Sequence, residues 1–271
     1  MIIVPKDQQL NNALYCLKAN NQYITLPNSI LTTSVSSAFS ISGWFYCTAL
    51  SAIQGGYNLI ALISNRYDIT LYGVTCGYLY NSTTSQFFIQ LIASNTAYNI
   101  AYYNISPGSV LNRWNHFVLT KGGLDVSTYN FYLNGISINA SSTTNNLTSS
   151  SVTSPSYQFT INAFGNSSSY TLHPYMSNCY FSTYMFYTKA LTSTEVLSLY
   201  KYPNTIPSTA LSNLVANYPF TNYNGESLTE TVSGNNGSLV NFALSITATS
   251  PNPQSGNTAW INTYNMTPIT T

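Results

Sequence analysis

Charged residues are scarce in this chain. Only 5% of its 271 residues are Asp, Glu, Lys or Arg, whereas about 25% is usual for a soluble protein. The seven basic and six acidic residues give a net charge of +1 and are spread thinly, without a Lys/Arg cluster. Because nucleic acids are bound largely through such clusters, the composition predicts no nucleic-acid partner.

Long apolar runs are also missing. No segment approaches the ~18 consecutive apolar residues of a transmembrane helix. The opening residues 1–7 lack the basic and apolar regions of a secretory signal. We therefore expect no membrane insertion, and no export directed by these first residues.

Cysteine is limited to Cys16, Cys47, Cys76 and Cys179, which are widely spaced and form no Cys-x-x-Cys pair. This spacing argues against a zinc site or a redox motif. Four cysteines permit three complete pairings, between which the sequence does not decide. Since each lies in an apolar or strand-like stretch, buried thiols and a single disulfide remain open alternatives.

The chain is instead rich in Asn, Ser, Thr and Tyr, with 24 Tyr and an aromatic fraction of 14%. Short apolar runs alternate with Asn/Ser/Gly/Pro clusters, which is typical of an all-β protein. Asn134-Gly135 has the composition of a hairpin turn. Strands are predicted over residues 13–17, 23–26, 39–47, 59–63, 69–74, 87–92, 98–103, 116–120, 129–133, 136–138, 159–162 and 180–187.

One short helix is predicted near 192–201. Thr192 and Glu195 have the spacing of a capping box. Val196 and Leu199 follow at helical spacing, and Pro203 ends the segment. A parallel-sheet α/β fold is therefore excluded.

Four motifs resemble, in order, those of laminin-G-like domains of the concanavalin A-like lectin/glucanase superfamily. They are residues 13–28, 39–46, 114–120 with 129–135, and 187–200. The resemblance covers residues 13–201 and implies a jelly-roll sandwich of two antiparallel sheets. It also places Trp44 and Trp114 at core positions. The chain departs from the family at Gln22, where Asp is usual, and at Ser182-Thr183, where acidic residues are usual.

The C-terminal third has an unusual order. Segments 214–220 and 233–241 resemble a part that normally precedes the first family motif. Either 203–242 supplies permuted closing strands, or it begins a truncated repeat; the first is favoured because 243–271 is too short for another sandwich. We expect a lead-in over 1–12, a sandwich over 13–242 and a C-terminal arm over 243–271. Trp260 and Ile261 either anchor this arm to the surface or contact a neighbouring subunit.

Catalysis has little support. Glycosidases of this superfamily need two carboxylates on opposite sides of the sugar, and the family's strand-borne Glu-x-Asp-x-Glu is missing. The two available bases are His116, predicted to be half-exposed on a strand, and His173, predicted in a loop. We predict that the protein is not an enzyme. The acidic residues of the chain are Asp7, Asp68, Asp125, Glu195, Glu226 and Glu230.

Calcium is the one cofactor that the resemblance suggests. Many family members hold Ca²⁺ at the rim of the sandwich through oxygen ligands. Asp68 and Asp125 are the candidate acidic ligands. No other cofactor is expected.

Tyrosine is too abundant to be entirely buried. Its ring stacks on sugars and is enriched at protein interfaces, so glycan contact and subunit contact remain alternatives. The candidates in predicted loops or strand ends are Tyr78, Tyr80, Tyr102, Tyr103 and Tyr170. Asn-x-Ser/Thr sequons make Asn81, Asn104, Asn139, Asn146, Asn166, Asn236 and Asn265 candidates for glycosylation.

These features together predict a non-enzymatic structural or surface protein of a virion or other extracellular assembly. The Asn/Thr/Tyr-rich composition resembles that of laminin-G-like domains encoded by large DNA viruses. The alternative is a free-standing glycan-binding adhesin, and a glycoside hydrolase comes third. Subunits of the same assembly and cell-surface glycans are the expected partners, at an extracellular or virion surface.

Overall fold

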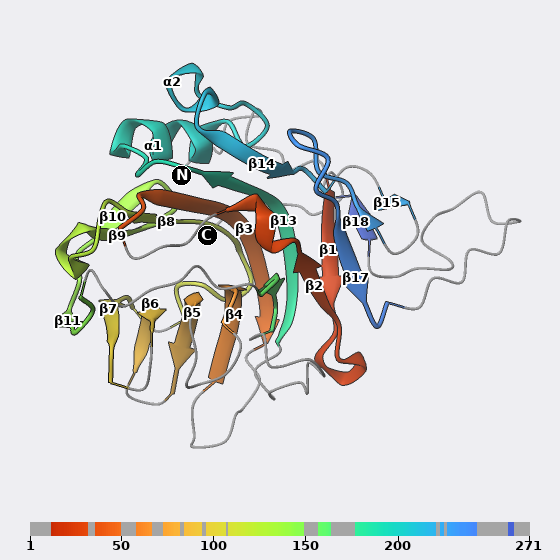
Figure 1. Cartoon of the computed structure of the whole chain (residues 1–271). Helices are drawn as coiled ribbons and strands as arrows, with labels where there is room; N and C mark the ends of the chain where they lie inside the picture. Colours follow the sequence, from red (N-terminus) through yellow and green to blue (C-terminus); the bar gives the residue numbers. More distant parts are fainter. Residues whose placement is uncertain are drawn as a thin grey trace, which may run out of the picture.

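The protein is a sandwich of two antiparallel sheets, as the sequence predicts (Figure 1). The computed structural model describes residues 12–31, 36–49, 58–66, 73–81, 84–93, 96–106, 108–148, 157–163, 177–220, 223–224, 227–242 and 260–262. The expected all-β jelly-roll fold is therefore confirmed. No helix in these ranges has the length and apolar character to cross a membrane.

Sheet A has eight strands. Its order is β10 (Ile136–Ile138), β9 (Tyr129–Leu133), β8 (Trp114–Lys121), β3 (Phe39–Ala49), β13 (Asn178–Tyr187), β1 (Asn12–Cys16) and β18 (Trp260–Asn262), with β14 (Leu214–Tyr218) paired to β13. Two strands pair with the same edge of β13: β1 with residues 179–181, and β14 with residues 184–187.

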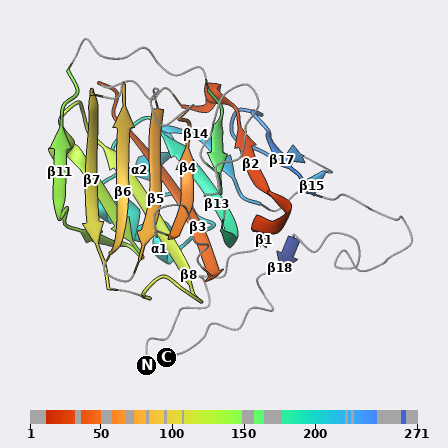
Figure 2. The same ribbon diagram turned by 90° about the horizontal axis from the view of Figure 1, so that it is seen from below.

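Sheet B has ten strands, and Figure 2 shows those from β11 to β4 side by side. Its order is β11 (Ser142–Asn145), β7 (Tyr98–Asn104), β6 (Ser85–Ile92), β5 (Gly73–Tyr80), β4 (Asn58–Ser64), β12 (Phe159–Ile161), β2 (Tyr23–Leu26), β17 (Gly237–Val240), β16 (Ser227–Leu228) and β15 (Tyr223–Asn224). The strand predicted over 69–74 lies mostly outside the described residues, and the strand described there is β5.

The C-terminal third adds strands to both sheets. β14 extends sheet A beside β13, and β17 pairs with β2 in sheet B. β18 pairs with β1, with Leu14 opposite Trp260. The side chains of Trp260 and Ile261 lie outside what the structure describes, so their role in an arm stays a prediction.

The core lies between the sheets and follows the period-2 alternation of the strands. In β3, Phe39, Ile41 and Phe45 are 0% exposed and face sheet B. Gly43 falls on the same face, where a Cβ atom would lie only 2.7 Å from the ring of Phe117 on β8. A glycine here lets the aromatic ring approach the backbone.

The local signals in the sequence are confirmed. Asn134 and Gly135 have φ values of 53° and 79°, as a two-residue hairpin turn of type I′ requires. Helix α1 spans Ser193–Lys201 and begins with the predicted capping box between Thr192 and Glu195. A second short helix, α2 (Ser208–Leu211), was not predicted, because one helical turn leaves little sequence signal.

Candidate functional site

The outer face of sheet A is covered only in part. Helices α1 and α2 lie on the side of this sheet that faces away from sheet B (Figure 1). They bury a small second core, in which Val196 and Leu199 of α1 pack on Val118, Tyr132 and Met185 of the sheet. Among the described residues, no helix covers the rest of this face (Figure 1).

Four aromatic side chains cross the same face in a line. Trp114 (β8), Tyr46 (β3), Tyr180 (β13) and Tyr15 (β1) are register partners on successive strands, and all are half-buried. Their ring centroids are 5.8, 5.8 and 4.2 Å apart in that order. We call these four residues the aromatic row.

The outward direction of the row follows from its neighbours in the sequence. Cys16, Cys47 and Cys179 are 0% exposed in the core between the sheets. Because successive side chains on a strand point to opposite faces, each adjacent tyrosine of the row points outward. The Tyr-Cys or Cys-Tyr dipeptide therefore occurs on three neighbouring strands, and this is the signal from which the row could have been found.

The row combines apolar ring surface with hydroxyl groups. Tyr15 and Tyr180 are stacked, whereas Tyr46 is turned by 78° relative to Tyr180. Desolvation, with smaller effects of Tyr15 and Tyr46, raises the pKa of Tyr180. Its hydroxyl is therefore neutral at pH 7, able both to donate and to accept a hydrogen bond.

Polar residues border the row at the ends of its strands. Lys18 N donates to Asn178 Oδ1 at 2.9 Å, and Thr48 Oγ1 donates to the carbonyl oxygen of Asn178 at 3.4 Å. Arg113 is exposed and directly precedes Trp114. We call Lys18, Thr48, Arg113 and Asn178 the polar rim.

A buried aromatic cluster lies beside the row, beneath α1. The His116 ring lies 4.8 Å from that of Trp44 and 6.1 Å from that of Tyr200. His116 is 1% exposed, so the prediction of a half-exposed histidine was wrong, because α1 covers this strand. Trp44 is buried as expected, but Trp114 is half-buried in the row and is not a core residue.

His116 is not placed to act as a base. Its Nε2 lies 2.8 Å from Ser42 Oγ, and no described residue forms a hydrogen bond with its Nδ1. Desolvation lowers the pKa of His116 to about 3. The ring is therefore neutral and enclosed at pH 7. His173 lies outside the described residues.

The tyrosines proposed as surface contacts lie in different environments. Tyr78 and Tyr103 are 0% and 1% exposed in the core, so they cannot contact a glycan at the surface, and these two predictions were wrong. Tyr80 is half-buried against the core, and Tyr102 is half-buried on the outer face of sheet B. Tyr170 lies outside the described residues.

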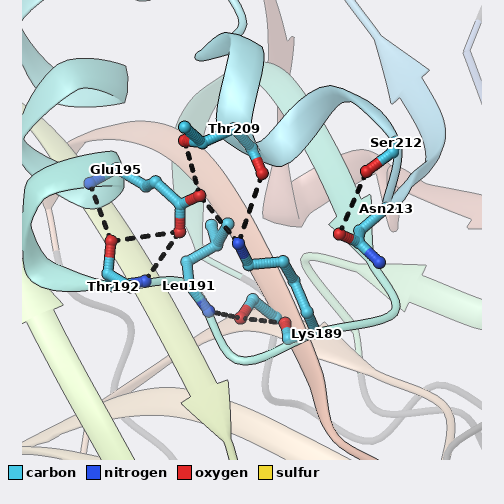
Figure 3. A network of polar contacts seen from close by, with 8 residues as sticks. Lys189, Leu191, Thr192, Glu195, Thr209, Ser212 and Asn213 are labelled. Carbon is cyan, nitrogen blue, oxygen red and sulfur yellow. Dashed lines mark hydrogen bonds and ion pairs between the residues drawn. The ribbon is translucent and has the colours of Figure 1, made fainter.

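Glu195 stabilises the packing of α1 and α2 (Figure 3). It forms an ion pair of 2.7 Å with Lys189 and accepts hydrogen bonds from Thr192 and Thr209. Burial alone would raise its pKa, but these hydrogen bonds outweigh that effect and lower the pKa to about 2. This carboxylate serves the fold.

Glu230 is 4% exposed and holds its own loop together. It accepts hydrogen bonds from the backbone N–H groups of Asn217, Val232 and Ser233. Burial acts to raise the pKa of Glu230, but these bonds lower it overall. Glu226 lies outside the described residues.

The two proposed calcium ligands are not seen together. Asp125 accepts hydrogen bonds from Ser127 N and Asn145 Nδ2, and the bond from Ser127 is the main reason for its lowered pKa. Asp68 lies outside the described residues. Within the described ranges, His, Cys, Asp and Glu side chains do not form a group of three or more that could hold a metal. Calcium therefore stays a prediction.

The asparagines of the candidate glycosylation sites differ in solvent exposure. Asn104, Asn139, Asn146 and Asn236 are exposed, and Asn81 is half-buried. The side chain of Asn236 already accepts a hydrogen bond from Glu230 N. Glycosylation stays a prediction, and two further candidates, Asn166 and Asn265, lie outside the described residues.

The chain is similar to several known structures. A candidate carbohydrate-binding protein from Bacteroides ovatus matches with a TM-score of 0.54 and 14% identity over 86% of this chain, which spans 58% of that protein. A heptameric SAP-like pentraxin from Limulus polyphemus matches with a TM-score of 0.46 and 13% identity over 72% of this chain and 83% of its own. The binding domain of botulinum neurotoxin serotype G matches with a TM-score of 0.44 and 16% identity over 69% of this chain and 44% of its own.

Two comparisons used the sequence alone. A search of curated proteins found no match. The family model described as the concanavalin A-like lectin/glucanases superfamily, of laminin G type, matches residues 18–197. This range covers more than half of the chain and includes the central strands of both sheets. The chain therefore belongs to this laminin G-like family of the concanavalin A-like lectin/glucanase superfamily.

Proposed function

We propose that this protein is a non-catalytic carbohydrate-binding domain that contacts its glycan through the aromatic row. The observation that carries the proposal is the alignment of Trp114, Tyr46, Tyr180 and Tyr15 on four neighbouring strands. At a strand spacing of about 4.8 Å, the row extends for about 14 Å. This length suits a short run of sugar rings.

The chemistry of the row matches that of a sugar. A sugar ring presents apolar C–H groups on its faces and hydroxyls around its edge. The row presents aromatic carbon together with phenol and indole groups. In the polar rim, Thr48 and Asn178 add groups that can exchange hydrogen bonds with hydroxyls, and Arg113 adds donors.

The three acidic residues that the structure describes support glycan binding in preference to glycoside hydrolysis. A glycosidase needs two carboxyl groups free to approach the glycosidic bond. Asp125, Glu195 and Glu230 instead accept hydrogen bonds from their own chain. We place the protein at an extracellular surface, where a glycan-binding domain of this family meets its ligand.

A glycan array, with and without calcium, tests the proposal. The wild-type protein should bind at least one glycan, and Tyr46→Ala and Trp114→Ala should lose most of this binding. Tyr202→Ala is the matched control, because Tyr202 is an exposed tyrosine outside the row. If no glycan binds, the proposal is wrong. If Tyr102→Ala alone removes binding, the site lies on sheet B.

A structural role in a virion or other extracellular assembly is the second candidate. β18 is the last of the described strands; it pairs with β1 and forms one edge of sheet A. Exchange of such a strand between identical chains would link copies. Light scattering of the full chain, beside a variant that ends at residue 242, tests this role. A monomer in both cases would contradict it.

A further inference from the structure

Three of the four cysteines lie next to one another on the inner face of sheet A. Cys16 on β1 is the register partner of Cys179 on β13, which is also the partner of Cys47 on β3. All three are 0% exposed. Cys76 lies on β5 in the facing sheet.

This arrangement limits the pairings that the sequence leaves open. A disulfide needs Cα atoms about 4.4–6.8 Å apart, and residues opposite each other on antiparallel strands are about 4.5 or 5.5 Å apart. Cys179 meets this condition with both neighbours. Cys16 and Cys47 are separated by two strand spacings, or about 9.6 Å, and Cys76 lies across a gap of about 10 Å between sheets. The geometry therefore allows one disulfide, with Cys179 as one partner.

The thiol contacts distinguish the two neighbours. Cys47 and Cys179 are joined by a side-chain hydrogen bond, whereas Cys16 interacts with Cys179 without one. Cys47 Sγ also lies 3.7 Å from the carbonyl oxygen of Asn178, the residue before Cys179. The Cys47 thiol is thus directed toward β13 beside Cys179.

We propose that Cys47 and Cys179 form a cross-strand disulfide when the protein folds in an oxidising compartment, while Cys16 and Cys76 remain thiols. The bond would join the two central strands of sheet A directly beneath Tyr46 and Tyr180. It does not depend on the proposed function of the row.

The step needs a disulfide oxidant such as oxidised glutathione. One protein thiolate attacks the oxidant, forms a mixed disulfide and releases one reduced glutathione. The second protein thiolate then attacks the cysteine sulfur of this mixed disulfide, forms the protein disulfide and releases a second reduced glutathione. Two protein thiols are oxidised, one glutathione disulfide is reduced, and the two protons pass to the released glutathione thiols.

The bond should form during folding and not afterwards. Both thiols are fully enclosed in the native core, and desolvation raises the pKa of Cys179 well above its usual value. Since the thiolate is the attacking species, the folded, reduced protein should react slowly. Unfolded and partly folded chains have no such barrier.

Refolding of the full chain from urea with mixed reduced and oxidised glutathione tests the proposal. The product is denatured, its free thiols are alkylated, and its mass and non-reduced peptides are measured. We expect two alkylated cysteines, a loss of about 2 Da for the bond, and a peptide that joins Cys47 to Cys179. Four alkylated cysteines would overturn the proposal.

Single alanine variants provide the controls. Cys16→Ala and Cys76→Ala should keep the disulfide, whereas Cys179→Ala should lose it, because Cys179 is the register partner of both Cys16 and Cys47. A bond that persists in Cys179→Ala, or a wild-type peptide that joins Cys179 to Cys16 or to Cys76, would contradict the assignment. The peptide map of the wild type decides the question even if a variant fails to fold.

Discussion

Acidification should destabilise the protein through His116. In the folded state desolvation lowers the pKa of this ring to about 3, whereas the ordinary pKa of histidine, expected in the unfolded chain, is 6.5. Between these values the unfolded chain binds more protons than the folded one, so stability falls as pH falls. At about 1.4 kcal/mol for each pH unit below 6.5, the loss by pH 5 is about 2 kcal/mol.

Urea unfolding followed by tryptophan fluorescence can measure this loss. The free energy of unfolding of the wild type should drop by about 2 kcal/mol between pH 7.5 and pH 5. His116→Gln is polar but does not titrate there, and it should lose most of the dependence. The lowered pKa values of Glu195 and Glu230 keep both carboxylates ionised in this range.

His173→Gln is the matched control for the loss of a histidine; since the sequence predicts His173 in a loop, we expect this variant to keep the pH dependence. An equal slope in the wild type and in His116→Gln would refute the reasoning. It would mean that water or a movement of α1 stabilises the protonated ring in the folded state.

Three further predictions concern stability and are measured by urea unfolding. Thr192→Ala removes the cap on α1 and should cost about 1 kcal/mol, whereas an unchanged midpoint would contradict the role of the capping box. Gly43→Ala should cost about 1–3 kcal/mol, since its Cβ would lie 2.7 Å from the Phe117 ring; a neutral result would show that the ring can move. Burial lowers the pKa of Lys121 from 10.5 to about 8. The stability of the wild type relative to that of Lys121→Met should therefore rise from pH 8 to 9.5, because the buried cysteines and tyrosines titrate alike in both proteins; a constant difference would contradict it.

The strands and the helix were predictable because their signals are local. The turn at Asn134-Gly135 needs two residues with positive φ, and Thr192 with Glu195 caps α1 within four residues. The prediction missed most of β5 (Gly73–Tyr80), and this omission left Tyr78 in an apparent loop.

The candidate site could not be predicted from local sequence signals. Trp114, Tyr46 and Tyr15 look like ordinary strand residues, and only the register of four strands brings them into line. That register depends on pairings between segments far apart in the chain. The burial of His116 likewise depends on the position of α1 over sheet A, which no local pattern specifies.

In the proposed function, the aromatic row binds a glycan. Calorimetric titration of the best glycan from the array, with the wild type and with Tyr46→Ala, tests it most directly. Tyr46 lies between Trp114 and Tyr180, so its loss should cost at least about 1.4 kcal/mol, a tenfold fall in affinity. An affinity equal to that of the wild type, in a variant that folds normally, would contradict the account.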